Sequence, residues 1–210
     1  MGEPEIVAEA KDRQGHMQLS LKRPQLKYIS EFLGLDCAVD VLQSDLFPNG
    51  KEITETMAVY DAVRKHPEFD QQDEDITMVS VGDGSTPRTA GFFAYMTHWQ
   101  CISVDPQLNT EGKHDEINRL RCIPERIQQQ SIEADRVVLT AVHSHADLQE
   151  SVDVVDAEEI LVVAMPCCQD LSLNDREPDK EYADWGCFSP ERTIKIWHLD
   201  KNMTTGENGE

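Results

Sequence analysis

The sequence of 210 residues carries 19 basic and 40 acidic side chains, and its formal net charge is -21. This length favours one domain with a sizeable core, and so strong a negative charge disfavours binding to long nucleic acids, because it repels their phosphates. No apolar run approaches the roughly 18–20 residues of a membrane span, and the first residues lack the apolar segment of a signal peptide. We therefore expect a cytoplasmic protein that does not bind membranes, with its six cysteines as reduced thiols.

Residues 1–70 are predicted to form an N-terminal extension and a helical cap. The first 23 residues are polar and charged, with weak signals of order. Apolar residues then recur at helical spacing from Leu26 to Leu33, and Gly34 is a suitable C-terminal stop. A second helix is predicted over residues 53–66.

Residues 71–200 alternate between patterns typical of strands and helices. Strands are predicted over residues 76–81, 101–104, 136–142 and 156–164, with a helix over 89–99 and a helical or mixed segment over 116–127, in which a short strand near residues 121–123 is an alternative. Residues 169–190 form a long acidic loop, and 193–199 alternate as in an added edge strand. The prediction is a Rossmann-like three-layer α/β sandwich with a mostly parallel sheet, an antiparallel edge strand and N-terminal helices, followed by a polar tail over residues 201–210.

The turn after the first predicted strand is rich in small and polar residues: Gly82, Asp83, Gly84, Ser85, Thr86 and Pro87. Its glycines allow positive φ and let a cofactor approach the backbone. Ser85 or Thr86 is predicted to cap the next helix, with Pro87 in its first turn and its exposed amides open to a polar or anionic group. A strand-to-helix turn that binds no ligand would look similar.

A second acid strengthens the prediction of a cofactor site. The second strand ends at Asp105-Pro106, about 20 residues after the turn, as expected of an acid that hydrogen-bonds a ribose hydroxyl. The turn matches neither GxGxxG nor GxxxxGK[ST], which disfavours dinucleotide enzymes and P-loop proteins. Over residues 76–165 the pattern resembles class I S-adenosylmethionine-dependent methyltransferases, although their first acid precedes the first glycine, where this chain has Val81.

The resemblance implies S-adenosylmethionine as the cofactor. The residues it implies for binding are those of the turn, the second acid with its proline, and one histidine after the strand over residues 136–142: Gly82, Asp83, Gly84, Ser85, Thr86, Pro87, Asp105, Pro106 and His143.

Polar residues also follow two later strands, where ligands sit in an open parallel sheet. One stretch runs from His143 through His145 to Asp147-Leu148, and the other is Pro166-Cys167-Cys168. The pair resembles a subgroup of methyltransferase-like proteins, many of them assigned to RNA modification, so RNA is a candidate acceptor.

Three roles are open for these residues. His143 or His145 could be the catalytic general base, since imidazole titrates near neutrality. Both histidines with Cys167 and Cys168 would suit zinc, but their spacing is unusual for zinc ligands, and we expect no metal. In the third interpretation these residues have structural roles: His143 caps the strand, and the cysteines pack against the cofactor or a helix.

These features predict an S-adenosylmethionine-dependent methyltransferase whose acceptor the sequence does not identify. The main alternative is a methyltransferase-like domain without catalysis that serves as a binding or assembly module. Another nucleotide-cofactor enzyme, such as a short oxidoreductase, and a zinc protein are further alternatives.

Overall fold

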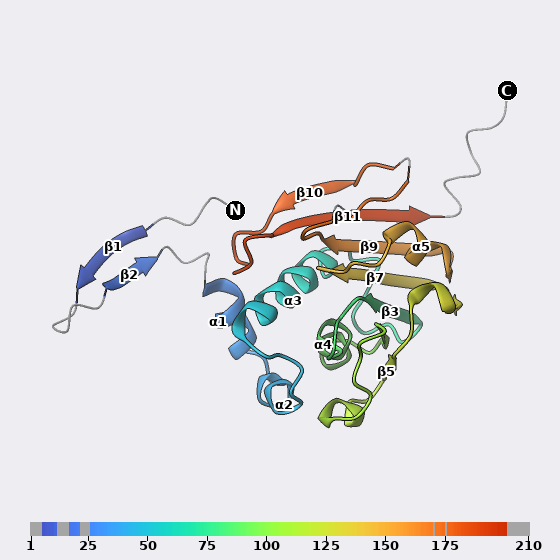
Figure 1. Ribbon diagram of the computed structural model, residues 1–210, viewed down its shortest axis with the longest axis horizontal. Helices are drawn as coiled ribbons and strands as arrows, with labels where there is room; N and C mark the ends of the chain where they lie inside the picture. The colour runs from blue at the N-terminus through green and yellow to red at the C-terminus, as the bar shows by residue number, and fades with distance from the viewer. Residues whose placement is uncertain (1–5, 12–16, 22–25, 170, 175, 201–210) are drawn as a thin grey trace.

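The computed structural model describes residues 6–11, 17–21, 26–169, 171–174 and 176–200, the first two stretches as backbone only. The predicted tail over residues 201–210 lies outside the described residues. Near the N-terminus, where the sequence pattern predicts little order, β1 (Ile6–Lys11) and β2 (Met17–Leu21) pair as a two-stranded antiparallel sheet (Figure 1). The alternation of apolar and polar residues in β2 fits this pairing.

The main sheet of the described residues has seven strands in the order β10-β11-β9-β7-β3-β4-β5 (Figure 1). Neighbours from β5 to β9 pair in parallel, whereas β11 is antiparallel to both β9 and β10. The strands are β3 (Ile76–Val81), β4 (Gln100–Val104), β5 (Leu120–Ile123), β7 (Arg136–Val142), β9 (Glu159–Met165), β10 (Lys180–Ala183) and β11 (Thr193–Asp200).

This topology confirms the Rossmann-like α/β prediction with its antiparallel edge. One detail differs, because β10 forms within the predicted loop over residues 169–190 and lies outside β11. Ile194 and Ile196 of β11 are buried in the core on one face of the sheet, and Trp197 is buried in the core on the other face. A short parallel pair, β6 (Ile132–Glu133) and β8 (Val155–Asp156), lies apart from the main sheet.

Helices and loops cover both faces of the sheet, and successive strand residues pack on opposite sides. In β3, Ile76 and Met78 join the core under the N-terminal helices and α4, while Val79 and Val81 join the core on the other face. The helices are α1 (Lys27–Leu33), α2 (Ala38–Gln43), α3 (Gly50–Val63), α4 (Arg88–Met96) and α5 (Leu148–Asp153).

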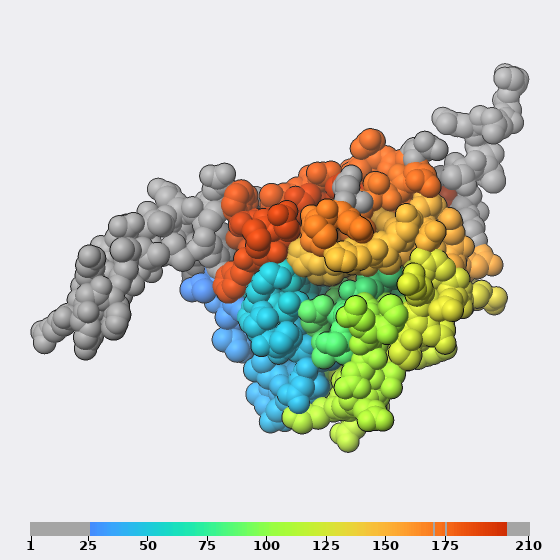
Figure 2. All heavy atoms as spheres, in the orientation of Figure 1, coloured from blue at the N-terminus to red at the C-terminus, as the bar shows by residue number. Residues whose placement is uncertain are grey.

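The N-terminal helices belong to the same core as the sheet. Figure 2 shows their blue atoms in one continuous body with the orange and red C-terminal segments. α3 begins three residues before the predicted helix, because the Asn49 side chain caps it by accepting hydrogen bonds from the backbone N–H groups of Lys51 and Glu52. Among the described helices, none combines the length and apolar character needed to cross a membrane.

The order of the strands fixes where a ligand can bind. From β3 the chain continues to β4 and β5 on one side, and it later returns to β7 and β9 on the other. In open α/β sheets a crevice forms at such a switch point, beyond the carboxyl ends of the strands. Gly82 directly follows β3, and His143 directly follows β7, so both stand at this crevice.

Candidate functional site

The turn after β3 has the backbone geometry that requires glycine. Gly82 and Gly84 have φ values of 79° and 77°, in the left-handed region that L side chains rarely adopt. Gly82 donates a hydrogen bond from its N–H to the carbonyl of Val104, 2.9 Å away. A Cβ added at Gly82 would stand 2.2 Å from the Ser144 hydroxyl oxygen, so the turn packs directly against the loop after β7.

Asp83 is a structural residue whose side chain is directed into the protein. It is 2% exposed, and it accepts hydrogen bonds from the hydroxyls of Ser80 and Ser103, both at 2.8 Å. It also accepts from the N–H groups of Thr89 and Ala90 in the first turn of α4, at 3.2 and 3.3 Å. Asp83 therefore caps α4 itself.

This cap changes the predicted role of the helix start. Ser85 and Thr86 do not cap α4; the Thr86 hydroxyl instead donates to the carbonyl of Leu46. The two helix N–H groups that Asp83 binds are not free for an anion, contrary to the sequence interpretation. Its negative charge at a helix N-terminus stabilises the helix and holds the turn in place.

Asp105 occupies the position predicted for the ribose-binding acid. Its Oδ2 accepts a hydrogen bond from the N–H of Gly84 at 2.9 Å, and its Oδ1 accepts from the N–H of Gln107 at 2.6 Å. The side chain is half-buried and faces the crevice between the ends of β3 and β4. Each carboxylate oxygen can accept further hydrogen bonds from a ligand.

A cavity of about 650 Å³ opens at this crevice. Of the predicted site residues, the structure brings six to its wall: Gly82, Gly84, Asp105, Pro106, His143 and His145. Four others do not line it: Asp83, Ser85, Thr86 and Pro87. The wall also includes residues that the sequence did not single out, among them Arg88, Val104, Arg126, Ile127, Gln128 and Glu150.

His143 is held by a buried acid that the sequence analysis missed. Its Nε2 lies 2.7 Å from Oε1 of Glu55, which is 1% exposed and also lies 2.6 Å from the Lys51 ammonium. Burial disfavours the Glu55 carboxylate, but hydrogen bonds from His143 and Lys51 outweigh burial and hold its pKa at about 2. His143 has a φ of 50°, and its Nδ1 is buried without a hydrogen-bond partner among the described residues.

A second, smaller cavity of about 330 Å³ also borders His143. His143 and Arg88 line both cavities, and the second is completed by residues of α3, the loop after β9 and the segment before β11, including Lys51, Glu52, Cys167 and Ser189. Arg88 donates to Glu52 Oε2 at 2.5 Å and to the carbonyl of Asp83 at 2.7 Å. The two cavities therefore share one wall.

The two predicted catalytic histidines have different surroundings. His143 faces Glu55, whereas His145 is exposed and lies against the thiols of Cys167 and Cys168. The structure thus does not assemble the four-residue His-Cys set that the sequence analysis considered for zinc.

No family model and no curated protein matches the chain. Among solved structures, it is similar to a point mutant of MtNAS, a nicotianamine synthase, in complex with S-adenosylmethionine, at a TM-score of 0.51 and 13% identity over 84% of this chain and 72% of that chain. It is also similar to MtNAS in complex with MTA and tNA, at a TM-score of 0.50 and 12% identity over 84% of this chain and 70% of that chain. At these identities the likeness concerns the fold.

Proposed function

We propose that the chain binds S-adenosylmethionine in the larger cavity and transfers its methyl group to an acceptor. The observation that carries the proposal is the placement of Gly82, Gly84 and Asp105 around a cavity at the switch point of the sheet. Glycine leaves room for a nucleoside beside the turn, and a carboxylate at the end of β4 can accept from ribose hydroxyls. The fold similarity to MtNAS, which binds S-adenosylmethionine, supports the choice of cofactor.

The charges around the cavity fit the groups of this cofactor. Asp105, Asp147 and Glu150 supply negative charge near a ligand whose sulfonium is positive, and Arg88 supplies a cation for its carboxylate. Val104 and Ile127 offer apolar contacts to an adenine ring. When bound, S-adenosylmethionine supplies an electrophilic methyl group.

The second cavity is the proposed acceptor site, because it shares His143 and Arg88 with the first. Glu55 holds the His143 ring by accepting a hydrogen bond from Nε2–H, so Nδ1 is the ring nitrogen left to act as a base; it is buried here, and the ring must turn for Nδ1 to reach the acceptor's proton. The Glu55 carboxylate then stabilises the imidazolium. The remaining rate enhancement comes from holding the cofactor and the acceptor in position on either side of the shared wall.

The acceptor is proposed to be a small molecule or a group of nucleobase size. The second cavity measures about 330 Å³, and the net charge of -21 repels long nucleic acids. RNA as the acceptor is suggested by the sequence resemblance alone, and an RNA fraction is included in the experiment below.

The proposal is tested by incubating the purified chain and S-adenosylmethionine, labelled in its methyl group, with separate RNA, protein and small-molecule fractions. The proposal predicts label in one fraction, with S-adenosylhomocysteine as the nucleoside product. His143→Asn should lower turnover by about 100-fold or more, the usual contribution of a general base. His98→Asn is the matched control, because His98 is exposed two residues before β4, at the amino end of that strand and away from the site at its carboxyl end.

Two results would contradict the proposal. Release of methylthioadenosine (MTA), which keeps the methyl group, in place of S-adenosylhomocysteine would show that another group of the cofactor is transferred. Cofactor bound without turnover in any fraction would favour the binding or assembly module.

A further inference from the structure

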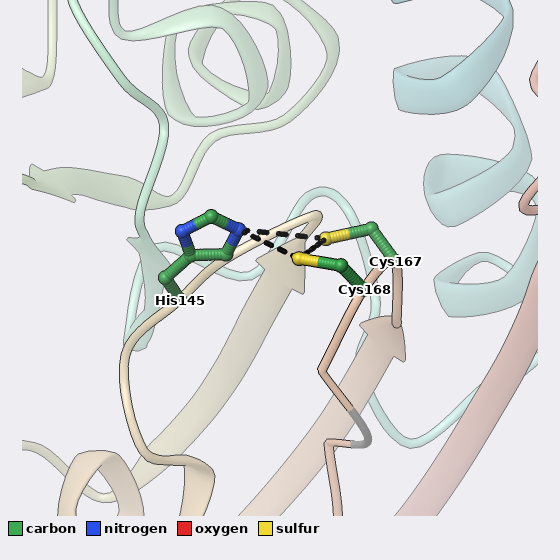
Figure 3. Close-up of side chains that lie close together, drawn as sticks. All are labelled: His145, Cys167 and Cys168. Carbon is green, nitrogen blue, oxygen red and sulfur yellow. Dashed lines mark hydrogen bonds between the residues drawn. The ribbon is translucent and has the colours of Figure 1, made fainter.

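Three side chains with metal-ligating atoms meet beyond the ends of β7 and β9. Figure 3 shows His145 facing Cys167 and Cys168 across the gap between the two strand ends. His145 Nε2 lies 3.2 Å from the Cys168 sulfur and 3.7 Å from the Cys167 sulfur, and the two sulfurs are 3.6 Å apart. Among the described residues, no other group of three or more His, Cys, Asp or Glu side chains is close enough to share an ion.

The sheet register explains why these residues meet. β7 and β9 are parallel, and Val142 pairs with Met165. His145 and Cys168 each stand three residues beyond that last pair, so the two loops present them at the same level. Ser144 is 1% exposed beside Gly82, and its hydroxyl accepts the N–H of Ala146, which fixes the backbone around His145.

The separations match those of a tetrahedral zinc site. With Zn–S near 2.3 Å and Zn–N near 2.0–2.1 Å, tetrahedral angles place two sulfurs about 3.8 Å apart and a nitrogen and a sulfur about 3.6 Å apart. The observed values of 3.6, 3.2 and 3.7 Å come within about 0.4 Å of these distances. Side-chain rotation suffices for this difference, because His145 and Cys168 are exposed.

The chemistry of the cluster also favours a cation over packing alone. Thiols are weak hydrogen-bond donors and acceptors, so the contacts between these groups gain little without an ion. Imidazole with two thiolates suits zinc or another borderline to soft cation. Two thiolates balance the charge of Zn²⁺, and the net charge of -21 raises the local concentration of cations.

We propose that His145, Cys167 and Cys168 bind one zinc ion, with the fourth position open to water or a solute ligand. Three protein ligands with an open position are typical of catalytic zinc sites, whereas structural sites have four. His145 lines the larger cavity and Cys167 lines the smaller one, so the ion would border both. The site stands on its ligands alone and does not depend on methyl transfer.

The test is metal binding by the full chain, kept reduced with a phosphine and stripped with a chelator. Titration with Zn²⁺ against a chromogenic competitor should give one tight equivalent per chain at neutral pH. Co²⁺ in its place should give thiolate charge-transfer absorption and the intense visible bands of tetrahedral coordination. Binding should weaken as the pH falls, because the thiols must lose their protons.

Variants distinguish this site from others. Cys167→Ser, Cys168→Ser and His145→Ala should each weaken zinc binding by more than about 100-fold, since loss of an outer-shell partner alone costs 10–100-fold. Cys37→Ser, which alters a half-buried thiol outside the cluster, should bind as the wild type does. Circular dichroism checks that each variant is folded. Binding below about 0.1 equivalent, or binding that the three variants leave unchanged, would overturn the proposal.

Discussion

Asp83→Asn tests the assignment of Asp83 as a cap rather than a cofactor ligand. Each carboxylate oxygen accepts from one hydroxyl and one backbone N–H, with Ser80 and Thr89 on Oδ1 and Ser103 and Ala90 on Oδ2. Asparagine has an NH₂ group in place of one of these oxygens, and this group donates hydrogen bonds where the oxygen accepted them. The facing hydroxyl can rotate to accept from it, but the facing N–H cannot, so one buried donor loses its partner.

The expected cost follows from these contacts. A buried unpaired donor costs about 1–3 kcal/mol, and loss of a negative charge at a helix N-terminus adds up to about 1 kcal/mol. We expect Asp83→Asn to lower the free energy of unfolding by about 1–4 kcal/mol. For a chain of this length, the upper part of this range corresponds to a Tm roughly 10 °C lower.

The assay is urea unfolding followed by tryptophan fluorescence and far-UV circular dichroism. Asp36→Asn is the matched control, because Asp36 is exposed, and it should change stability by less than about 0.5 kcal/mol. If Asp83→Asn were as stable as the control and lost only cofactor affinity, the assignment would be wrong.

Three further predictions follow from the site. Gly82→Ala should destabilise the chain by more than about 2 kcal/mol in urea unfolding, because its Cβ would meet Ser144 at a positive φ. Gly34→Ala, where a Cβ would meet nothing closer than 3.4 Å, should stay within about 1 kcal/mol, and equal effects would refute the close-packing argument. The Glu55 pKa lies at about 2, below its usual 4.5, so its carboxylate stabilises the fold above about pH 5 and this contribution is lost as the pH falls toward 2. The stability advantage of the wild type over Glu55→Gln should therefore shrink over that range in urea titrations, and a constant difference would contradict the ion-pair assignment. Arg88→Gln should weaken S-adenosylhomocysteine binding by about 10-fold in calorimetry, through loss of a charge-assisted contact to the ligand carboxylate, and unchanged affinity would place that carboxylate elsewhere.

The buried parallel strands could be predicted closely from the sequence. β3 and β7 match the predicted residues, because strands covered on both faces read as continuous apolar runs bounded by turns. β10 could not be predicted in this way, since its residues Lys180–Ala183 are mostly exposed and polar. It forms because β11 presents a free edge to which it pairs.

The candidate site was predicted in outline but not in its side-chain contacts. Gly82 and Asp105 reach the cavity as expected, because turn chemistry and spacing fix the backbone there. The cap of α4 was predicted at Ser85 or Thr86 and is instead Asp83, since the choice depends on which side chain folds back toward α4. Glu55 was missed because it lies 88 residues before His143, on a helix whose packing the sequence does not reveal.

The cysteine cluster illustrates the same limit. The spacing of His143, His145, Cys167 and Cys168 along the chain is unusual for zinc ligands, and the sequence therefore predicted no metal site. The register between β7 and β9 brings three of its members together and leaves His143 with Glu55. Such a cluster is visible only when both strand ends are placed in space.

Calorimetric titration of S-adenosylhomocysteine into the wild type and Asp105→Ala tests the central claim most directly. The account predicts one site per chain in the wild type and affinity at least about 30-fold lower in the variant, because the carboxylate loses charge-assisted hydrogen bonds from the ribose. Urea unfolding checks that the variant remains folded. Absence of heat in the wild type, or equal affinity in a folded variant, would contradict a cofactor site between Gly84 and Asp105.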